Sequence, residues 1–293
     1  MSFEDFSIYV FPFSRLDEKI SDNDLQKKYY DRWMQKYAKN LNVGDASIIE
    51  WNLRCHKAMR EMFSSADFFV EAKICLENGC YSAYYFALYY SLFHAVYATL
   101  FMDTDTSIDS LLKITHTNLV NKFINAYCRG KPHLFNDDIN EIVKNYRYRR
   151  EYFSYCTPFN NIFNFEHDLA EVEQIILDYM QLTSFHSLML SNSFNNTKLK
   201  IVKLNAGANA QYFWELIEKL FTKVNEVGKT VRDSAIDDFI SECFRDGCRP
   251  EYIALDLDHQ FDELHTYDWG HDIKDGGLKA ADVYSVVYRA VCG

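Results

Sequence analysis

A short segment of the chain combines arginine and tyrosine in a way that suits contact with a nucleic-acid backbone. Residues 147–155 read RYRREYFSY, within a helix that we expect to begin after Asn136 and to run to about residue 155. Arginine binds phosphate through a planar fork of N–H donors that stays charged, and tyrosine rings can stack on bases. The side chains that we expect to contact RNA are Lys144, Arg147, Arg149, Arg150 and Tyr152.

Arg150 stands out because it falls on the apolar stripe of its own helix. The stripe follows a helical spacing through Ile139, Val143, Tyr146, Arg150 and Phe153. An ordinary charged side chain is not expected there. Arg150 is therefore interpreted in two ways, as a phosphate ligand or as a buried arginine paired with an acid such as Glu166 or the Glu151 of a partner helix. The tyrosines around it likewise serve either base stacking or simple packing.

The elements that position this segment are expected to be long helices. The chain has 293 residues, 48% apolar and 16% aromatic, with only 10 Gly and 4 Pro. So few helix breakers over this length favour helices joined by short loops over a β-rich architecture. We therefore predict a mainly α fold in three parts, with an N-terminal helical extension (1–50), a helical bundle (51–195) and a smaller, acidic and mostly helical C-terminal region (196–293).

The helix after Gly79 is the most distinctive of these elements. Residues 80–102 contain no Asp, Glu, Lys or Arg, but six tyrosines, two serines and His94 are spread along them. That distribution favours a buried helix over a membrane span, so no membrane contact is expected, and His94 is interpreted as a core residue. Small side chains recur every four residues, which lets a neighbouring helix approach closely. They are Ala83, Ala87, Ser91 and Ala95.

Apolar periodicity and breakers place the remaining elements. Helices are predicted at 25–40, 47–77, 116–128, 136–155 and 164–185, and Asn78-Gly79 is a good helix stop. A linker is expected at 192–196 (NSFNN). Beyond it we predict a short strand at 200–204 and helices at 211–227 and 233–244, and residues 280–291 are compatible with helix or strand.

The order of these elements from about 55 to 185 resembles the HEPN family. The resemblance is carried by the helix ending in Asn-Gly, by GCYSAYYFALYYSLFHAVYATL after it, by the short helix beginning at His116 and by RYRREYFSY. HEPN domains are antiparallel helical bundles that often form homodimers. Many are metal-independent ribonucleases of bacterial toxin–antitoxin and anti-phage systems. The resemblance implies RNA as a partner, an antitoxin or defence-system protein as another, and no cofactor.

The chain departs from the family at its catalytic motif, an arginine followed four to six residues later by histidine. Tyr155 stands at the expected place after Arg150, and we take these two as the catalytic candidates. A tyrosine hydroxyl with an ordinary pKa near 10 is a poor general base at neutral pH. Histidine is the usual base, so His116 or His167 would have to reach Arg150 through the tertiary structure.

Acidic residues are concentrated at the C-terminal end of the chain. The formal charge is −11, and residues 246–293 hold ten acids against four bases. A solvated acidic surface is the simplest interpretation. Alternatives are a cover over the basic residues 144–150, a zinc site using Cys243 and Cys248, or a metal site of mixed ligands. The candidate ligands of that last site are Asp256, Asp258, His259, Asp262 and His265.

Three functions follow from these patterns. The leading expectation is a HEPN-like protein that acts on RNA, as a metal-independent ribonuclease or as an RNA binder. The first alternative is a non-catalytic HEPN-like module that binds a protein or nucleotide partner, which the missing histidine favours. The second is a metal-dependent enzyme built on the C-terminal Asp/His cluster. Eight cysteines without a CxxC pair, and a first segment unlike a secretory signal, lead us to expect a cytoplasmic protein.

Overall fold

The computed structural model describes residues 3–6, 11–156, 164–205, 207–224, 230–232, 236–265 and 278–293. Helices dominate this part of the chain, as predicted, and β1 (Thr222–Val224) pairs with β2 (Thr230–Arg232) in a small antiparallel sheet. The helices are α1 (Ser14–Lys19), α2 (Asn23–Leu41), α3 (Asp45–Glu77), α4 (Tyr81–Phe101), α5 (Ile108–Leu112), α6 (His116–Phe123), α7 (Ile139–Tyr155), α8 (Phe165–Asn196), α9 (Ala208–Phe221), α10 (Asp237–Asp246), α11 (Leu257–His265) and α12 (Ala280–Val291).

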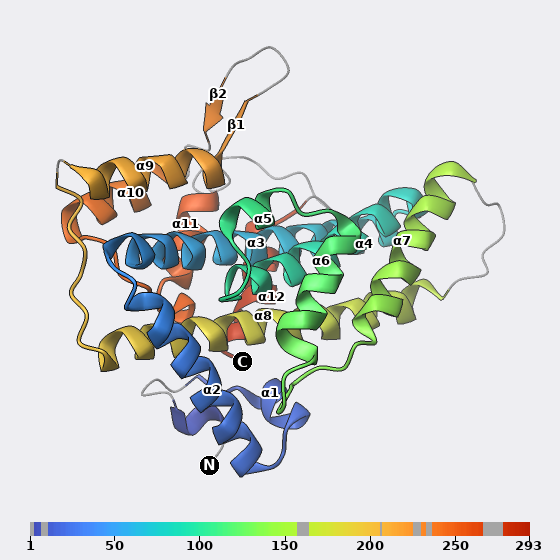
Figure 1. Ribbon diagram of the computed structural model, residues 1–293. Coiled ribbons are helices and arrows are strands. Elements are labelled where there is room, and N and C mark those ends of the chain that lie inside the picture. The colour runs from blue at the N-terminus through green and yellow to red at the C-terminus, as the bar shows by residue number, and fades with distance from the viewer. Residues whose placement is uncertain are drawn as a thin grey trace.

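The centre of the fold is the close contact between α3 and α4, which lie side by side in Figure 1. Ser65 and Ser91 meet across this contact, and each hydroxyl donates to the other residue's backbone carbonyl at 2.8 Å. Small side chains make such an approach possible. Ala87 and Ala95 of the predicted stripe are buried with Ser91, whereas Ala83 at the start of α4 is exposed.

The turn between α3 and α4 forms where the sequence predicts it. Gly79 has a φ of +68°, in the left-handed region that favours glycine, and Cys80 N–H donates to the Cys75 carbonyl at 2.8 Å. This bond satisfies a carbonyl at the end of α3. The chain then reverses and α4 runs back along α3.

The long helix α8 packs against α4 on one side and against α2 on another. His186 of α8 is buried between two tyrosines of α2. The single hydrogen of the Tyr37 hydroxyl is donated to the Met102 carbonyl at 2.8 Å, so its oxygen accepts from His186 Nδ1 at 2.9 Å. His186 Nε2 then accepts from Tyr29 at 2.8 Å. Burial lowers the pKa of His186 well below its ordinary value, which agrees with this neutral form.

The C-terminal elements pack on the same long helices. α9 lies on α3, and α12 lies on both α3 and α8. A single β-bridge joins Val202 to Cys248, and Asn52 of α3 donates to the Arg249 carbonyl at 2.7 Å. In Figure 1, α9 and α10 occupy the end of the fold away from α7. The described C-terminal region therefore packs on α3 and α8, the same long helices on which α2 and α4 pack.

Several predicted boundaries are wrong. Residues 192–196 belong to α8, not to a linker, because Asn192 and Ser193 bond to Tyr30 and to the Met34 carbonyl of α2. The strand predicted at 200–204 is reduced to the one bridge at Val202. The predicted 211–227 helix ends at Phe221 and continues as β1, and residues 225–229 lie outside the described chain. Asn136 does not cap α7, which begins three residues later.

Other predictions of secondary structure are confirmed. The helices expected at 25–40, 47–77 and 116–128 correspond to α2, α3 and α6, and the last five residues of the third, Ile124–Cys128, are π-helical. Residues 280–291, left open between helix and strand, form α12. None of the described helices has both the length and the apolar character that crossing a bilayer requires.

The buried His186 contact leads to a stability prediction. Replacing Tyr37 with phenylalanine removes the partner of both His186 Nδ1 and the Met102 carbonyl, and leaving buried polar groups unpaired costs about 1–3 kcal/mol. We expect the Tyr37→Phe variant to lose about that much free energy of unfolding in urea titrations. Tyr288→Phe, at an exposed tyrosine of α12, is the control and should stay within about 0.5 kcal/mol of the wild type.

Candidate nucleic-acid site on α7

The helix that carries the arginines is held by its apolar face. Ile139, Val143, Tyr146 and Phe153 are all buried, as the predicted stripe requires. The Phe153 ring lies 4.7 Å from the Tyr85 ring of α4, measured between centroids. Tyr146 donates to Glu171 of α8 at 2.5 Å. α7 is thus attached to both α4 and α8, and its remaining faces carry the charged residues.

Arg149 helps to hold α7 against its neighbouring helices. Its guanidinium forms an ion pair with Asp168 of α8, and both side chains are largely buried. Asp168 also accepts a hydrogen bond from the Tyr85 hydroxyl at 2.6 Å. The guanidinium carbon lies 5.2 Å from the centroid of the Tyr146 ring. With these contacts, the structure places Arg149 at the junction of α4, α7 and α8.

Arg150 contacts a different group of residues, on the side of α7 that faces α6. Its side chain is only 17% exposed, and its guanidinium carbon lies 4.7 Å from the centroid of the Tyr89 ring. The Tyr89 hydroxyl is hydrogen-bonded to His116 Nδ1 at 2.6 Å. One tyrosine of α4 therefore touches both the arginine of α7 and the histidine at the start of α6. The tertiary structure brings His116 to the arginine segment.

Glu151 is the carboxylate that pairs with the arginines of this group. It accepts from Arg147 Nε at 2.9 Å and from the Arg150 guanidinium at 3.4 Å. The acid beside Arg150 is thus its own neighbour on α7. Two arginines facing one carboxylate leave one excess positive charge beside His116.

The charges around His116 favour its neutral form. Burial lowers the pKa of its imidazole below the ordinary value of 6.5, and the positive charges of Arg150 and Arg147 lower it further. Among the described residues, no hydrogen-bond partner contacts His116 Nε2. Burial raises the pKa of Tyr89 to about 12, so its hydroxyl stays protonated at neutral pH. His116 is therefore the group of this site that can accept a proton near pH 7.

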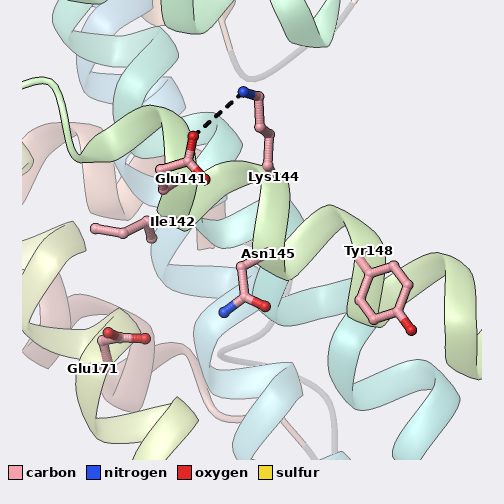
Figure 2. Close-up of a pocket in the computed structure, with 6 residues that line it drawn as sticks. All are labelled: Glu141, Ile142, Lys144, Asn145, Tyr148 and Glu171. Atoms are coloured by element: carbon pink, nitrogen blue, oxygen red, sulfur yellow. Dashed lines mark hydrogen bonds and ion pairs between the residues drawn. The ribbon is translucent and has the colours of Figure 1, made fainter.

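The other face of α7 is less suited to phosphate. A hollow of about 560 Å³ between α7 and α8 is lined by Glu141, Ile142, Lys144, Asn145, Tyr148 and Glu171. Figure 2 shows the Lys144 ammonium turned toward Glu141, to which it is bonded at 3.5 Å. Two carboxylates against one ammonium give this hollow a negative charge. Lys144 is exposed, but its nearest partner is an acid.

The remaining sequence candidates do not join the Arg150 group. Tyr155 is 82% exposed at the last position of α7, about 140° around the helix from Arg150 at 3.6 residues per turn. His167 is also exposed, and its Nδ1 lies 3.9 Å from Asp168. The ring of Tyr152 stacks on that of Tyr148, with centroids 6.0 Å apart. Of the two histidines considered as bases, the structure brings His116 to the arginines.

The C-terminal Asp/His residues separate into small contacts. His259 Nδ1 lies 3.3 Å from Asp256, whereas Asp258 accepts a short hydrogen bond from Tyr284. In the part of the chain that the structure describes, no three His, Cys, Asp or Glu side chains are grouped so that they could hold a metal. The side chain of His265 and residues 266–277 lie outside that part. The described α11 and α12 lie away from α7 in Figure 1.

Two residues of the site escaped the sequence analysis. Tyr89 is one of six tyrosines in a helix that is aromatic on most sides, so nothing in its spacing marks it. Asp168 stands in the first turn of α8, where an acid is common for reasons of helix charge alone. Charge pairing with Arg149 was a usable signal for Asp168.

No family model, curated protein or solved structure matches the chain. The candidate site therefore rests on the geometry of its own residues.

The buried Arg149–Asp168 pair gives a prediction about stability. Removing one member of a buried ion pair leaves the other charge without its partner and costs about 3–5 kcal/mol. We expect Asp168→Ala to lower the free energy of unfolding by that amount in urea titrations. Asp31→Ala removes an exposed carboxylate paired with Lys27 on α2 and should cost at most about 1 kcal/mol. Equal effects of the two substitutions would contradict the role assigned to Asp168.

The Arg150 group gives a prediction about proton affinity. Replacing Arg150 with glutamine removes a positive charge that lowers the pKa of His116. We therefore expect the pKa of His116 to rise in the Arg150→Gln variant, as measured by NMR titration of the imidazole C–H signals. Arg245→Gln, at an exposed arginine of α10, should leave that titration unchanged. The same His116 pKa in the wild type and in both variants would contradict the placement of Arg150 beside His116.

Proposed function

We propose that this protein is a HEPN-like, metal-independent ribonuclease in which Arg150 binds the scissile phosphate and His116 moves the proton. The observation that carries the proposal is the position of Tyr89. Its ring supports the Arg150 guanidinium at 4.7 Å and its hydroxyl bonds to His116 Nδ1 at 2.6 Å. An arginine and a histidine that lie far apart in sequence thereby meet in one place. This pair replaces the missing arginine–histidine spacing on a single helix.

The chemistry follows from these two groups. The neutral imidazole of His116 accepts the proton of an RNA 2′-hydroxyl through Nε2, while Tyr89 holds the ring by Nδ1. The 2′-oxygen attacks the adjacent phosphorus and the bond from phosphorus to the 5′-oxygen breaks. The products are a 2′,3′-cyclic phosphate and a 5′-hydroxyl, whose proton comes from the imidazolium or from water. Arg150 stabilises the charge that develops on the phosphate oxygens.

Glu151 controls access to the arginines in this proposal. Its carboxylate forms ion pairs with Arg147 and Arg150, and an RNA phosphate would replace it as their partner. The exchange replaces one oxyanion with another at the same guanidinium groups, so the buried charge of Arg150 stays paired throughout. Arg147 is half-exposed and can follow the phosphate outward.

The proposed fold within the chain is a bundle of α3, α4, α7 and α8. These four helices contact one another through α4, which packs on the other three. We extend the proposal to a homodimer and to an antitoxin or defence-system protein as a partner, because the family that the sequence resembles works in that way. The basic and aromatic surface of α7 is where RNA would lie.

A cleavage assay tests the catalytic proposal. The purified full-length protein is incubated with a single-stranded RNA oligonucleotide, with and without EDTA, beside Arg150→Gln and His116→Asn variants. We expect EDTA-resistant cleavage that falls by about 10²–10⁴-fold in either variant, the range for loss of a proton-transfer group or a charge-stabilising donor. The 5′ fragment should end in a 2′,3′-cyclic phosphate.

The control is Arg245→Gln, which removes an exposed arginine paired with an acid on α10 and should cleave like the wild type. The same oligonucleotide made of DNA should resist cleavage, because it lacks the 2′-hydroxyl. Cleavage that EDTA abolishes would instead favour the C-terminal Asp/His residues. No cleavage by any of the samples would favour the non-catalytic binding module.

A further inference from the structure

A second cleft lies beside His94 and Tyr97, further along α4 than Tyr89 of the Arg150 group. It has a volume of about 820 Å³ and is formed by α3, α4, α5 and α9, with β1 at its edge. Clefts that hold small molecules commonly measure about 300–1,000 Å³. The cleft joins two parts of the chain, because α9 follows the long helices in sequence and packs back on α3. Nothing in the RNA proposal uses it.

The walls of this cleft carry more basic than acidic side chains. Lys57 and Arg60 extend from α3 and Lys219 from α9, whereas Glu61 is the one carboxylate among the lining residues. The protein as a whole carries a formal charge of −11, so a positive cleft is a departure from its average. Positive groups that line a cleft attract anions by focusing the field there. The ligand is therefore expected to be an anion.

Glu61 is paired with one of the three basic side chains and with His94. Its two oxygens contact Lys57 Nζ at 2.7 Å and His94 Nδ1 at 2.6 Å. Burial raises the pKa of Glu61, but Lys57 and His94 outweigh it and hold the pKa at about 2. The carboxylate therefore stays ionised and holds the imidazole of His94 by its Nδ1. His94, interpreted from the sequence as a core residue, is instead partly exposed to the cleft.

Aromatic and apolar side chains line the cleft beside the charged ones. Phe221 at the end of α9 lies beneath the basic residues, with Lys57 Nζ at 5.7 Å and the Arg60 guanidinium carbon at 5.9 Å from its ring centroid. Tyr97 of α4 is fixed by a hydrogen bond from its hydroxyl to the Leu111 carbonyl at 3.1 Å. Leu112, which also lines the cleft, is 40% exposed. A ligand with a flat apolar part would cover these side chains.

We propose that this cleft binds a small phosphorylated ligand with an aromatic group, of the size of a nucleoside monophosphate. The phosphate would lie among Lys57, Arg60 and Lys219, and the base against Tyr97 and Phe221. Lys219 now bonds to Asp109 of α5 at 3.1 Å, an exposed pair at the rim that a phosphate would compete with. The ligand would hold α9 to α3 and α4.

Calorimetric titration of the full-length protein at low salt tests this site, with AMP, adenosine and inorganic phosphate as the probes. We expect AMP to bind at least about tenfold more tightly than either of the other two, because only AMP fills both halves of the cleft. Equal binding of AMP and adenosine, or of AMP and phosphate, would overturn the proposal. So would the absence of AMP binding.

Two substitutions at the rim should act in opposite directions. Lys219→Gln removes a phosphate donor and should weaken AMP binding by about three- to tenfold, whereas Asp109→Asn removes the competing carboxylate and should strengthen it. The matched control is Lys27→Gln, which removes another exposed lysine paired with an aspartate, outside the cleft. Equal effects of Lys219→Gln and Lys27→Gln would place the bound AMP elsewhere. RNA cleavage by the Lys219→Gln variant separates this outcome from failure of the α7 site.

Discussion

The close approach of α3 and α4 at Ser65 and Ser91 is the contact on which the rest of the fold depends. Each serine hydroxyl bonds to the other helix's backbone, so the two helices meet without large side chains between them. The rings of α4 are consequently left to its other sides. There they hold the remaining helices, with Tyr85 bonded to Asp168 of α8, Tyr89 to His116 of α6, and Tyr97 to the Leu111 carbonyl of α5.

Both candidate sites are consequences of that arrangement. Tyr89 on one side of α4 joins the arginine helix to His116, and His94 on another side lies in the basic cleft with Glu61 of α3. Tyr89 of α4 holds His116 by its Nδ1, and Glu61 of α3 holds His94 of α4 by its Nδ1. A histidine oriented in this way is ready to exchange a proton or to accept a hydrogen bond.

The three arginines of α7 show how neighbouring residues of one type take different roles. Arg149 is paired with a buried aspartate at the junction of three helices, whereas Arg147 and Arg150 share the half-exposed carboxylate of Glu151. A buried charge needs a fixed partner because water cannot replace it, and an exposed pair can exchange partners at little cost. Arg150 lies between these cases. Its side chain is largely buried against the Tyr89 ring, and its hydrogen-bond acceptor among the described residues is Glu151, its neighbour on α7.

The sequence by itself determined the helical class, most helix positions, the turn at Gly79 and the unusual placement of Arg150 on an apolar stripe. These depend on periodicity and backbone preference, which act over a few residues. Only the tertiary structure decided that α8 continues through residues 192–196, because α2 supplies partners for Asn192 and Ser193. It alone also decided that His116 meets Tyr89 and that Glu61 holds His94. Such pairs join residues 27 and 33 positions apart, and no local pattern encodes which side of a helix will face which neighbour.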